Sequence, residues 1–177
     1  MKRSVVFWQA IGFVFTALMG TLLHFLYDWS GQSFVVGLFS AVNESIWEHM
    51  KLLYVPMFAF AIFERRFIKS RNFWCAKLIG TVVGLLLIPV IYYTYTGAFG
   101  VFADWFNIAI FFISAFLAFY IETKLLKSEK EFCISPFACL IVLISIGVIF
   151  VSFTISPPDI PLFCEYLARN SCRQHGL

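Results

Sequence analysis

The sequence predicts an all-α integral membrane protein with five transmembrane helices, one re-entrant or interfacial half-helix, an inner N-terminus and an outer C-terminus. Of its 177 residues, 61% are hydrophobic and only 13% are charged, whereas soluble domains carry about a quarter charged residues. The apolar residues also form runs long enough to cross a bilayer, which takes about 20 residues. A soluble fold could not bury this much apolar surface, so we expect one transmembrane domain over residues 1–177, with the lipid bilayer as its partner.

The five spans follow from these runs and from the loops between them. We place them at about residues 4–27, 43–67, 73–95, 105–126 and 133–156, with the half-helix at about 33–42 and an outer tail at 157–177. The half-helix is too short to cross, because ten residues extend about 15 Å and the hydrocarbon core is about 30 Å thick. We place the start of the next helix at Asn43, since Asn is a good N-cap; the capping-box spacing of Ser45 and Glu48 offers an alternative start two residues later.

The second span carries charges into the membrane. Its uncharged run at residues 52–63 extends only about 18 Å as a helix, so it cannot cross alone. To span, the helix must include the preceding charged block, which places Glu48, His49 and Lys51 at membrane depth. Ionisable groups at that depth are costly and by default indicate a functional site.

Basic residues indicate how the chain crosses the membrane. Three clusters lie at the ends of the spans or in the short segments that join them: Lys2 and Arg3; Arg65, Arg66, Lys69 and Arg71; Lys124, Lys127 and Lys130. With five crossings these clusters share one side, and the positive-inside rule makes it the cytoplasmic side of the plasma membrane. Because the net charge is only +3 and is spread over these loops, we expect no nucleic-acid partner.

This topology gathers polar residues from separate spans at the outer end. The candidate binding residues are His24, Asp28, Asn43, Glu44, Ser45, Glu48, His49, Lys51, Asp104 and Asn107. Ser152, Thr154 and Asp159 close the last span at the same end. We therefore expect an outward-facing intramembrane site with several acids and two histidines.

Three functions fit such a site, and the first is purely structural. Lys51 follows Glu48 at i,i+3 on one helix face, so the two side chains can form an ion pair that holds the half-helix in place. On this interpretation the protein is a structural or accessory membrane protein without catalysis.

The second interpretation, our working hypothesis, is binding or translocation of a small polar solute or cation. Glu48 and His49 would exchange protons with the solute or contact it, since imidazole is the side chain that titrates near physiological pH. Broken helices beside a polar cavity recur at such sites in transporters. Five spans without an internal repeat make a small transporter, so this interpretation also predicts a homo-oligomer.

The third interpretation is a membrane-embedded hydrolase with a divalent metal ion as cofactor. His24, Asp28 and His49, with either Glu48 or Glu44, could supply three ligands and a general base, which leaves one coordination position for water. The sequence has no His-Glu-x-x-His motif, and neither histidine has a second one at i+4. Whether the protein is an enzyme therefore stays open.

The five cysteines show no metal-binding or redox spacing. Cys75, Cys133 and Cys139 fall at or inside predicted spans, where cysteine usually packs as a small hydrophobic side chain. Cys164 and Cys172 lie in the tail and could pair if that tail faces an oxidising compartment, although a tail without packing often leaves its thiols free.

Three blocks of the sequence together resemble a known family. They are His24-Phe25-x-Tyr27, then Asn43-Glu44-Ser45-x-Trp47-Glu48-His49-x-Lys51-Leu52 with Pro56, and finally Pro157-Pro158-x-Ile160-Pro161-Leu162-Phe163. The pattern resembles a family of small bacterial and archaeal multi-pass membrane proteins that is catalogued as a domain of unknown function. The resemblance implies a bacterial inner-membrane protein with a polar signature, and it implies no activity. Cys164-Glu165 stands where that family has an Asp and a short end with Gly and Tyr.

Overall fold

The computed structural model describes residues 2–100 and 104–164, which form six α-helices and a short 3-10 helix. In chain order they are α1 Lys2–Trp29, α2 Phe34–Gly37, α3 Ile46–Glu64, α4 Phe73–Phe99, α5 Asp104–Lys127, α6 Pro136–Ile155 and η1 Pro161–Phe163. All the α-helices except α2 are long and apolar enough to cross a membrane. The predicted fold class, five spanning helices and a shorter one, is confirmed.

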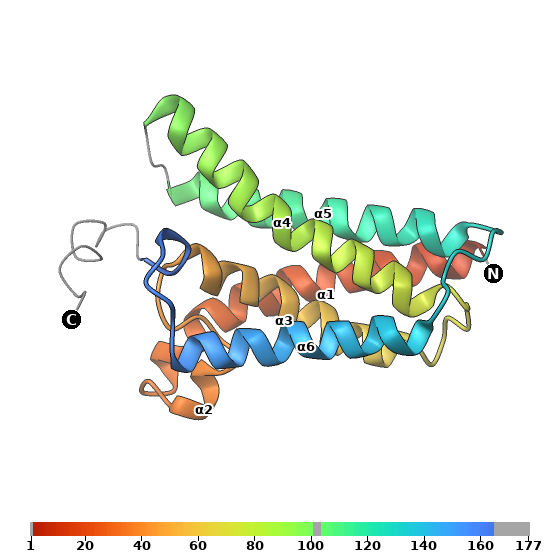
Figure 1. Cartoon of the computed structure of the whole chain (residues 1–177), viewed down its shortest axis with the longest axis horizontal. Coiled ribbons are helices and arrows are strands. Elements are labelled where there is room, and N and C mark those ends of the chain that lie inside the picture. The colour runs from red at the N-terminus through yellow and green to blue at the C-terminus, as the bar shows by residue number, and fades with distance from the viewer. Residues whose placement is uncertain (1, 101–103, 165–177) are drawn as a thin grey trace.

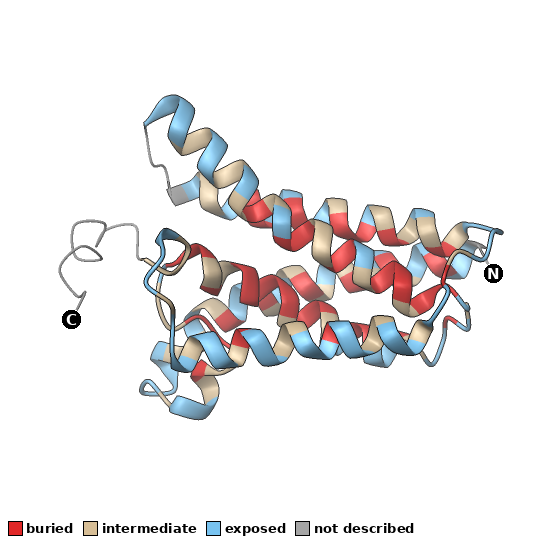
Figure 2. Cartoon of the chain, in the orientation of Figure 1, coloured by how far each residue is buried: buried red, intermediate tan, exposed pale blue. Residues whose placement is uncertain are grey.

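Helix α3 is the most enclosed helix of the bundle (Figure 1). It contacts α1, α4, α5 and α6, and 61% of its apolar stretch is buried, against 11% for α6. Buried residues concentrate on the faces that point into the bundle (Figure 2). Large apolar side chains such as Leu18, Leu86 and Val148 are exposed on the outside, as expected for helices whose outer faces meet lipid.

Small residues let α4 and α5 approach each other closely. A Cβ on Gly80 would lie 2.9 Å from the Ala118 carbonyl oxygen, and a Cβ on Gly84 would lie 3.0 Å from the Ala118 Cβ. Small residues four positions apart are a common means of close helix packing in membranes, where the hydrophobic effect does not drive helices together. The two helices therefore pack as a close pair.

The start of α3 follows the capping-box spacing. Ser45 is the N-cap, and its hydroxyl oxygen accepts a hydrogen bond of 3.3 Å from the Glu48 amide. Helix α3 thus begins at Ile46, and Asn43 lies in the preceding turn, where its side-chain oxygen accepts from the Ser45 amide at 3.0 Å. Pro56 removes one backbone donor inside α3 without ending the helix.

The segment between α1 and α3 forms only a short helix. Helix α2 covers four residues of the predicted half-helix, and turns lead on to Ser45. Gly37 ends α2 in a tight position, because a Cβ there would lie 2.9 Å from the Val42 side chain and 3.1 Å from the Tyr27 ring. Glycine therefore allows the α2 backbone to reach the interior of the bundle.

The two ends of the bundle carry different charged residues, and Figure 1 shows which segments lie at each end. The N-terminus and the loops at residues 65–72 and 128–135 lie at one end, which we call the basic end. The segment at residues 30–45 and η1 lie at the other, which we call the histidine end because α1 and α3 place His24 and His49 there. The three basic clusters thus share one end, and that this end faces the cytoplasm stays a prediction.

One expectation about the cysteines is wrong. Cys75 and Cys133 form a disulfide, and Cys139 Sγ lies 2.7 Å from Cys75 Sγ, whereas the sequence predicts three separately packed thiols. The bonded cysteines are 58 residues apart. Helix packing brings them together, so no local sequence spacing predicts the disulfide. Cys172 lies outside the described residues, and so does the question of its pairing with Cys164.

Candidate functional site

Two histidines and a carboxylate meet at the histidine end. His24 lies near the end of α1, Glu44 in the turn before α3 and His49 in the first turn of α3. Glu44 Oε1 is 3.5 Å from His24 Nε2, and Glu44 Oε2 is 3.6 Å from His49 Nε2. The potential ligand atoms of these three residues all lie within 4.8 Å of one another. We call this group the histidine triad.

A backbone contact sets the orientation of the His49 ring. Its Nδ1 is 2.8 Å from the Ser45 carbonyl oxygen, and because a carbonyl only accepts, Nδ1 carries a proton. In the neutral ring, Nε2 then holds a lone pair facing the Glu44 carboxylate, which is also an acceptor. Two facing acceptors repel each other, so this arrangement suits an electron-poor group between them.

A small cavity adjoins the triad at Glu44 and His49. Its volume is about 30 Å³, which is enough for one or two water molecules. The other lining residues are Ile46, Ile88, Tyr92, Asn107, Ile110 and Phe111. The cavity gives the triad access to water and places the Asn107 side chain of α5 at the same site.

Glu48 and Lys51 form a separate, buried ion pair. Lys51 Nζ is 2.5 Å from Glu48 Oε2, and neither residue is more than 2% exposed. Lys51 donates to the Gly37 carbonyl oxygen at 2.9 Å and lies 2.9 Å from the Thr154 hydroxyl, while Glu48 accepts from the Val42 amide at 3.1 Å. The pair therefore ties α2 and α6 to the start of α3.

Comparison with protein families assigns the chain to one of them. A model described as a family of unknown function, DUF6512, matches residues 2–171. The chain belongs to this family. The match confirms the predicted resemblance to an uncharacterised family, and five apolar helices make this DUF6512 protein a candidate multi-pass membrane protein. No curated protein and no solved structure matches it, so its activity has to be argued from its own side chains.

In this DUF6512 protein, the ten candidate binding residues occupy several places. The triad and its cavity hold His24, Glu44, His49 and Asn107, the ion pair holds Glu48 and Lys51, and the turn before α3 holds Asn43 and Ser45. Asp28 is exposed at the end of α1 and is not part of either potential metal-ligand group among the described residues. Asp104 begins α5, and its side chain lies outside the described part of the protein.

Some contributors are missing from the sequence prediction. Gly37 supplies a backbone carbonyl to Lys51, and Tyr92 lines the cavity. A backbone acceptor has no sequence signal, because every residue carries one. The sequence analysis places Thr154 at the same end as Glu48 and Lys51, but its contacts with them have no sequence signal, because both partners are more than 100 residues away.

A second buried polar cluster lies toward the basic end, and sequence reasoning missed it. Lys77 Nζ is 2.5 Å from Glu64 Oε2 and 2.6 Å from Glu122 Oε2. Gln9 donates to Glu64 Oε1 at 2.8 Å, and none of the four residues is more than 2% exposed. The available signal was the presence of Lys77 and Glu122 inside otherwise apolar spans.

Proposed function

We propose that this DUF6512 protein binds a divalent transition-metal ion at its histidine end, through His24, Glu44 and His49. The observation that carries the proposal is the approach of two imidazole Nε2 atoms to one carboxylate from separate segments of the chain. Two histidines and a glutamate are a common ligand set for zinc. The proposal narrows the working hypothesis, a small polar solute or cation, to a metal cation.

The spacing of the ligand atoms supports a metal ion. Zinc binds imidazole nitrogen and carboxylate oxygen at about 2.0–2.2 Å, so ligand atoms around a tetrahedral ion lie about 3.4 Å apart. The nitrogen–oxygen distances of 3.5 and 3.6 Å are close to this value. They are also longer than a good hydrogen bond of about 2.7–3.2 Å, which a proton shared between the groups would form.

The cavity beside Glu44 and His49 supports water as a further ligand. Its volume of about 30 Å³ is enough for one or two water molecules beside the triad. Three protein ligands and one water form the open arrangement of catalytic zinc sites, whereas structural sites usually have four protein ligands. The triad therefore fits a reactive or exchangeable ion better than a permanent structural one.

Metal-dependent hydrolysis is the second candidate function, and the place of Asn107 favours it. A metal ion turns a bound water into a nucleophile at neutral pH. Asn107 lines the same cavity, and an amide N–H there could stabilise the negative charge that develops on a substrate oxygen. In this scheme His24, Glu44 and His49 hold the ion, and Asn107 supports the transition state.

Translocation of the bound ion remains a separate hypothesis with its own requirement. Glu48 directly precedes His49 and is engaged with Lys51, so an ion moving past the triad would have to compete with that pair. A homo-oligomer, predicted for a transporter of five spans, belongs to this hypothesis.

The binding proposal is tested by metal analysis of detergent-purified protein. After equilibration with zinc and removal of the excess by gel filtration, we expect about one zinc ion per chain. His24→Ala, His49→Ala and Glu44→Gln should each lose most of it. Asp28→Asn is the matched control, because Asp28 is exposed near the triad and outside it. Zinc retained by a His49→Ala, Glu44→Gln double variant, or lacking in folded wild-type protein, would contradict the proposal.

Two further assays separate the candidate functions. Proteoliposomes that enclose a zinc-sensitive or pH-sensitive dye report transport of zinc or protons, which Glu48→Gln should impair. Flux equal to that of liposomes without the protein would contradict the translocation hypothesis. Zinc-dependent ester or amide hydrolysis that Asn107→Ala lowers at least about tenfold, without loss of bound zinc, supports the hydrolase. Equal rates of hydrolysis by wild-type protein and Asn107→Ala would contradict the hydrolase hypothesis.

A further inference from the structure

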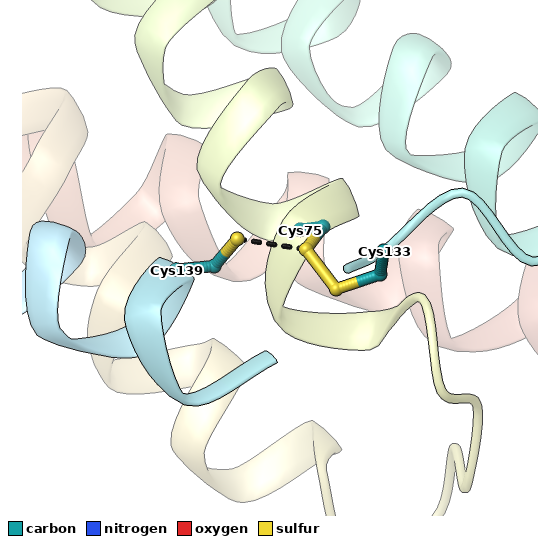
Figure 3. A group of neighbouring side chains, drawn as sticks. All are labelled: Cys75, Cys133 and Cys139. Carbon is teal, nitrogen blue, oxygen red and sulfur yellow. Dashed lines mark hydrogen bonds between the residues drawn. A yellow bond between two sulfur atoms is a disulfide. The ribbon is translucent and has the colours of Figure 1, made fainter. Parts of the chain in front are cut away.

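Three sulfur atoms meet at the basic end (Figure 3). Cys75 lies in the first turn of α4, Cys133 in the segment before α6 and Cys139 in the first turn of α6. Cys75 and Cys133 form a disulfide, and Cys139 Sγ lies 2.7 Å from Cys75 Sγ. All three sulfurs lie within 4.8 Å of one another. This sulfur cluster is at the opposite end from the histidine triad, and the proposed function does not use it.

Cys139 approaches the disulfide on the side of Cys75. Figure 3 shows the sulfurs of Cys139 and Cys133 on opposite sides of the Cys75 sulfur. Thiol–disulfide exchange has this arrangement, because the attacking sulfur enters opposite the sulfur that leaves. Cys139 is the free cysteine among the described residues, so it is the available nucleophile.

Contacts other than the disulfide hold the cluster together. The Asn72 side-chain oxygen accepts from the Phe132 amide at 3.1 Å and from the Cys133 amide at 3.3 Å. The Asn72 side-chain nitrogen donates to the Lys130 carbonyl oxygen at 2.8 Å. Because Asn72 directly precedes α4, these bonds fasten the segment before α6 to the start of α4. Cys133 therefore stays beside Cys75 when the disulfide opens.

The three sulfurs differ in access. Cys75 and Cys133 are only 7% and 5% exposed, whereas Cys139 is half-buried. Because exchange requires contact between the attacking sulfur and its target, a thiol from solution reaches Cys139 more easily than the disulfide itself. Cys139 is therefore the point of entry to the cluster.

We propose that Cys75, Cys133 and Cys139 form a thiol–disulfide exchange site that reacts with small thiols through Cys139. The Cys139 thiolate attacks Cys75 Sγ, which forms a Cys75–Cys139 disulfide and releases Cys133 as a thiolate. The released thiolate takes up the proton that Cys139 lost, so this step consumes no oxidant or reductant.

Reduction by a small thiol follows from the exchanged form. One external thiolate attacks the Cys139 sulfur, releases Cys75 as a thiolate and leaves a mixed disulfide on Cys139. A second external thiol then attacks the mixed disulfide and releases Cys139. The balance is three protein thiols and one disulfide of the small thiol, formed from two small thiols and the original protein disulfide.

Exchange also changes which segments are joined covalently. In the Cys75–Cys133 form, α4 is bonded to the segment before α6, and in the Cys75–Cys139 form it is bonded to α6 itself. Helices α4 and α6 are in contact in the structure. The site therefore couples exchange with small thiols to the attachment of α6, which is the least enclosed span.

Disulfide mapping tests the exchange step. The full chain carries Cys164→Ser and Cys172→Ser, so that the cysteines of the cluster are the three that remain, and free thiols are alkylated after an acid quench. We expect mass spectrometry to find both Cys75–Cys133 and Cys75–Cys139 peptides in the oxidised protein. A single Cys75–Cys133 disulfide, with Cys139 alkylated in every molecule, would overturn the proposal.

Reduction kinetics test the role of Cys139 as the point of entry. Cys139→Ser keeps the disulfide and lacks the attacking thiol, so we expect glutathione to reduce it at least about tenfold more slowly than the parent protein. Ile134→Ala is the matched control, because Ile134 is close in sequence and 96% exposed. Equal reduction rates for Cys139→Ser and the parent, with unchanged melting temperatures, would contradict the proposal.

Metal analysis of the reduced protein distinguishes thiol–disulfide exchange from metal binding by the same three sulfur atoms. Three thiolates at this spacing also suit a soft ion such as copper(I) or zinc. Stoichiometric metal that Cys139→Ser removes and His49→Ala does not would replace the exchange site with a thiolate metal site. Reduced protein whose metal content does not change with Cys139→Ser supports exchange.

Discussion

Two buried charge clusters lie along α3, and they differ in charge balance. Near the start of the helix, one carboxylate, Glu48, pairs with one ammonium, Lys51. At its end, two carboxylates, Glu64 and Glu122, share the single ammonium of Lys77. Both clusters are almost completely buried. The comparison shows which buried charges are matched within the fold and which leave a surplus.

The Glu48–Lys51 cluster is the matched one. Close pairing offsets the cost of removing both charges from water, which is several kcal/mol for each ion. The Gly37 carbonyl, the Thr154 hydroxyl and the Val42 amide supply further hydrogen-bond partners. Such a cluster holds segments together and has no spare charge to offer a ligand.

The Glu64–Lys77–Glu122 cluster carries one carboxylate more than it has ammonium groups. Among the described residues, neither Glu122 Oε1 nor Gln9 Oε1 has a hydrogen-bond partner. Buried acceptors without partners cost about 1–3 kcal/mol each. This cluster is therefore the less satisfied of the two, and a neutral group in place of one carboxyl group would balance it.

Lys77→Met should have the largest effect. It leaves two buried carboxylates without a counter-charge, which costs at least about 3–5 kcal/mol. We expect little folded protein in fluorescence-detected gel filtration of detergent extracts. Lys124→Met is the control, because Lys124 is exposed on α5. Normal yield and melting temperature of Lys77→Met would contradict the assignment of charge to Glu64 and Glu122.

Lys51→Met should come next, at about 3 kcal/mol, because Glu48 keeps its contacts with Val42 and Thr154. Adding Glu48→Gln should recover much of the loss, since the double variant buries no unpaired charge. Thermal melting in detergent measures both. A double variant that melts at or below the melting temperature of Lys51→Met would contradict the description of Glu48 and Lys51 as a matched pair.

Replacing one glutamate by glutamine in each cluster distinguishes a surplus carboxylate from a matched one. Glu122→Gln should change the free energy of unfolding by less than about 1 kcal/mol, because Lys77 keeps Glu64 and the surplus charge disappears. Glu48→Gln should cost about 2–3 kcal/mol, because it leaves Lys51 without its carboxylate. Similar melting temperatures for the two variants would refute the assignment of matched and surplus charge.

Methyl groups added beside the clusters should cost less than the loss of a charged partner. A Cβ at Gly80 would collide with Glu122 Cγ and lie 2.9 Å from the Ala118 carbonyl, which cannot move away easily. Gly80→Ala should therefore cost about 2 kcal/mol. Gly37→Ala meets side-chain atoms of Val42 and Tyr27, so about 1 kcal/mol is expected. Melting curves of both variants measure these losses of stability. A larger loss for Gly37→Ala than for Gly80→Ala would contradict this prediction.

Much of the fold follows from local sequence patterns. Run length and composition predict five spans and a short helix, because the thickness of the bilayer sets the length of each span. The spacing of Ser45 and Glu48 predicts the cap of α3, and the spacing of Glu48 and Lys51 allows their ion pair. These features depend on residues within one turn of helix, so the helical period is enough to derive them.

The candidate sites depended on packing between helices. Topology predicts that the two histidines share one end of the bundle, but not that Glu44 lies between them while Asp28 stays exposed. Lys77 and Glu122 are 45 residues apart, and each on its own is only a charge inside a span.

Span number, span length and the contacts within one turn of α3 can therefore be read from the sequence, because lipid thickness and helical period act locally. The partners of His24, Lys77 and Cys75 could come only from the tertiary structure. Helix rotation and tilt, which decide the side chains that meet, are set by packing against neighbouring helices and not by the hydrophobic run itself.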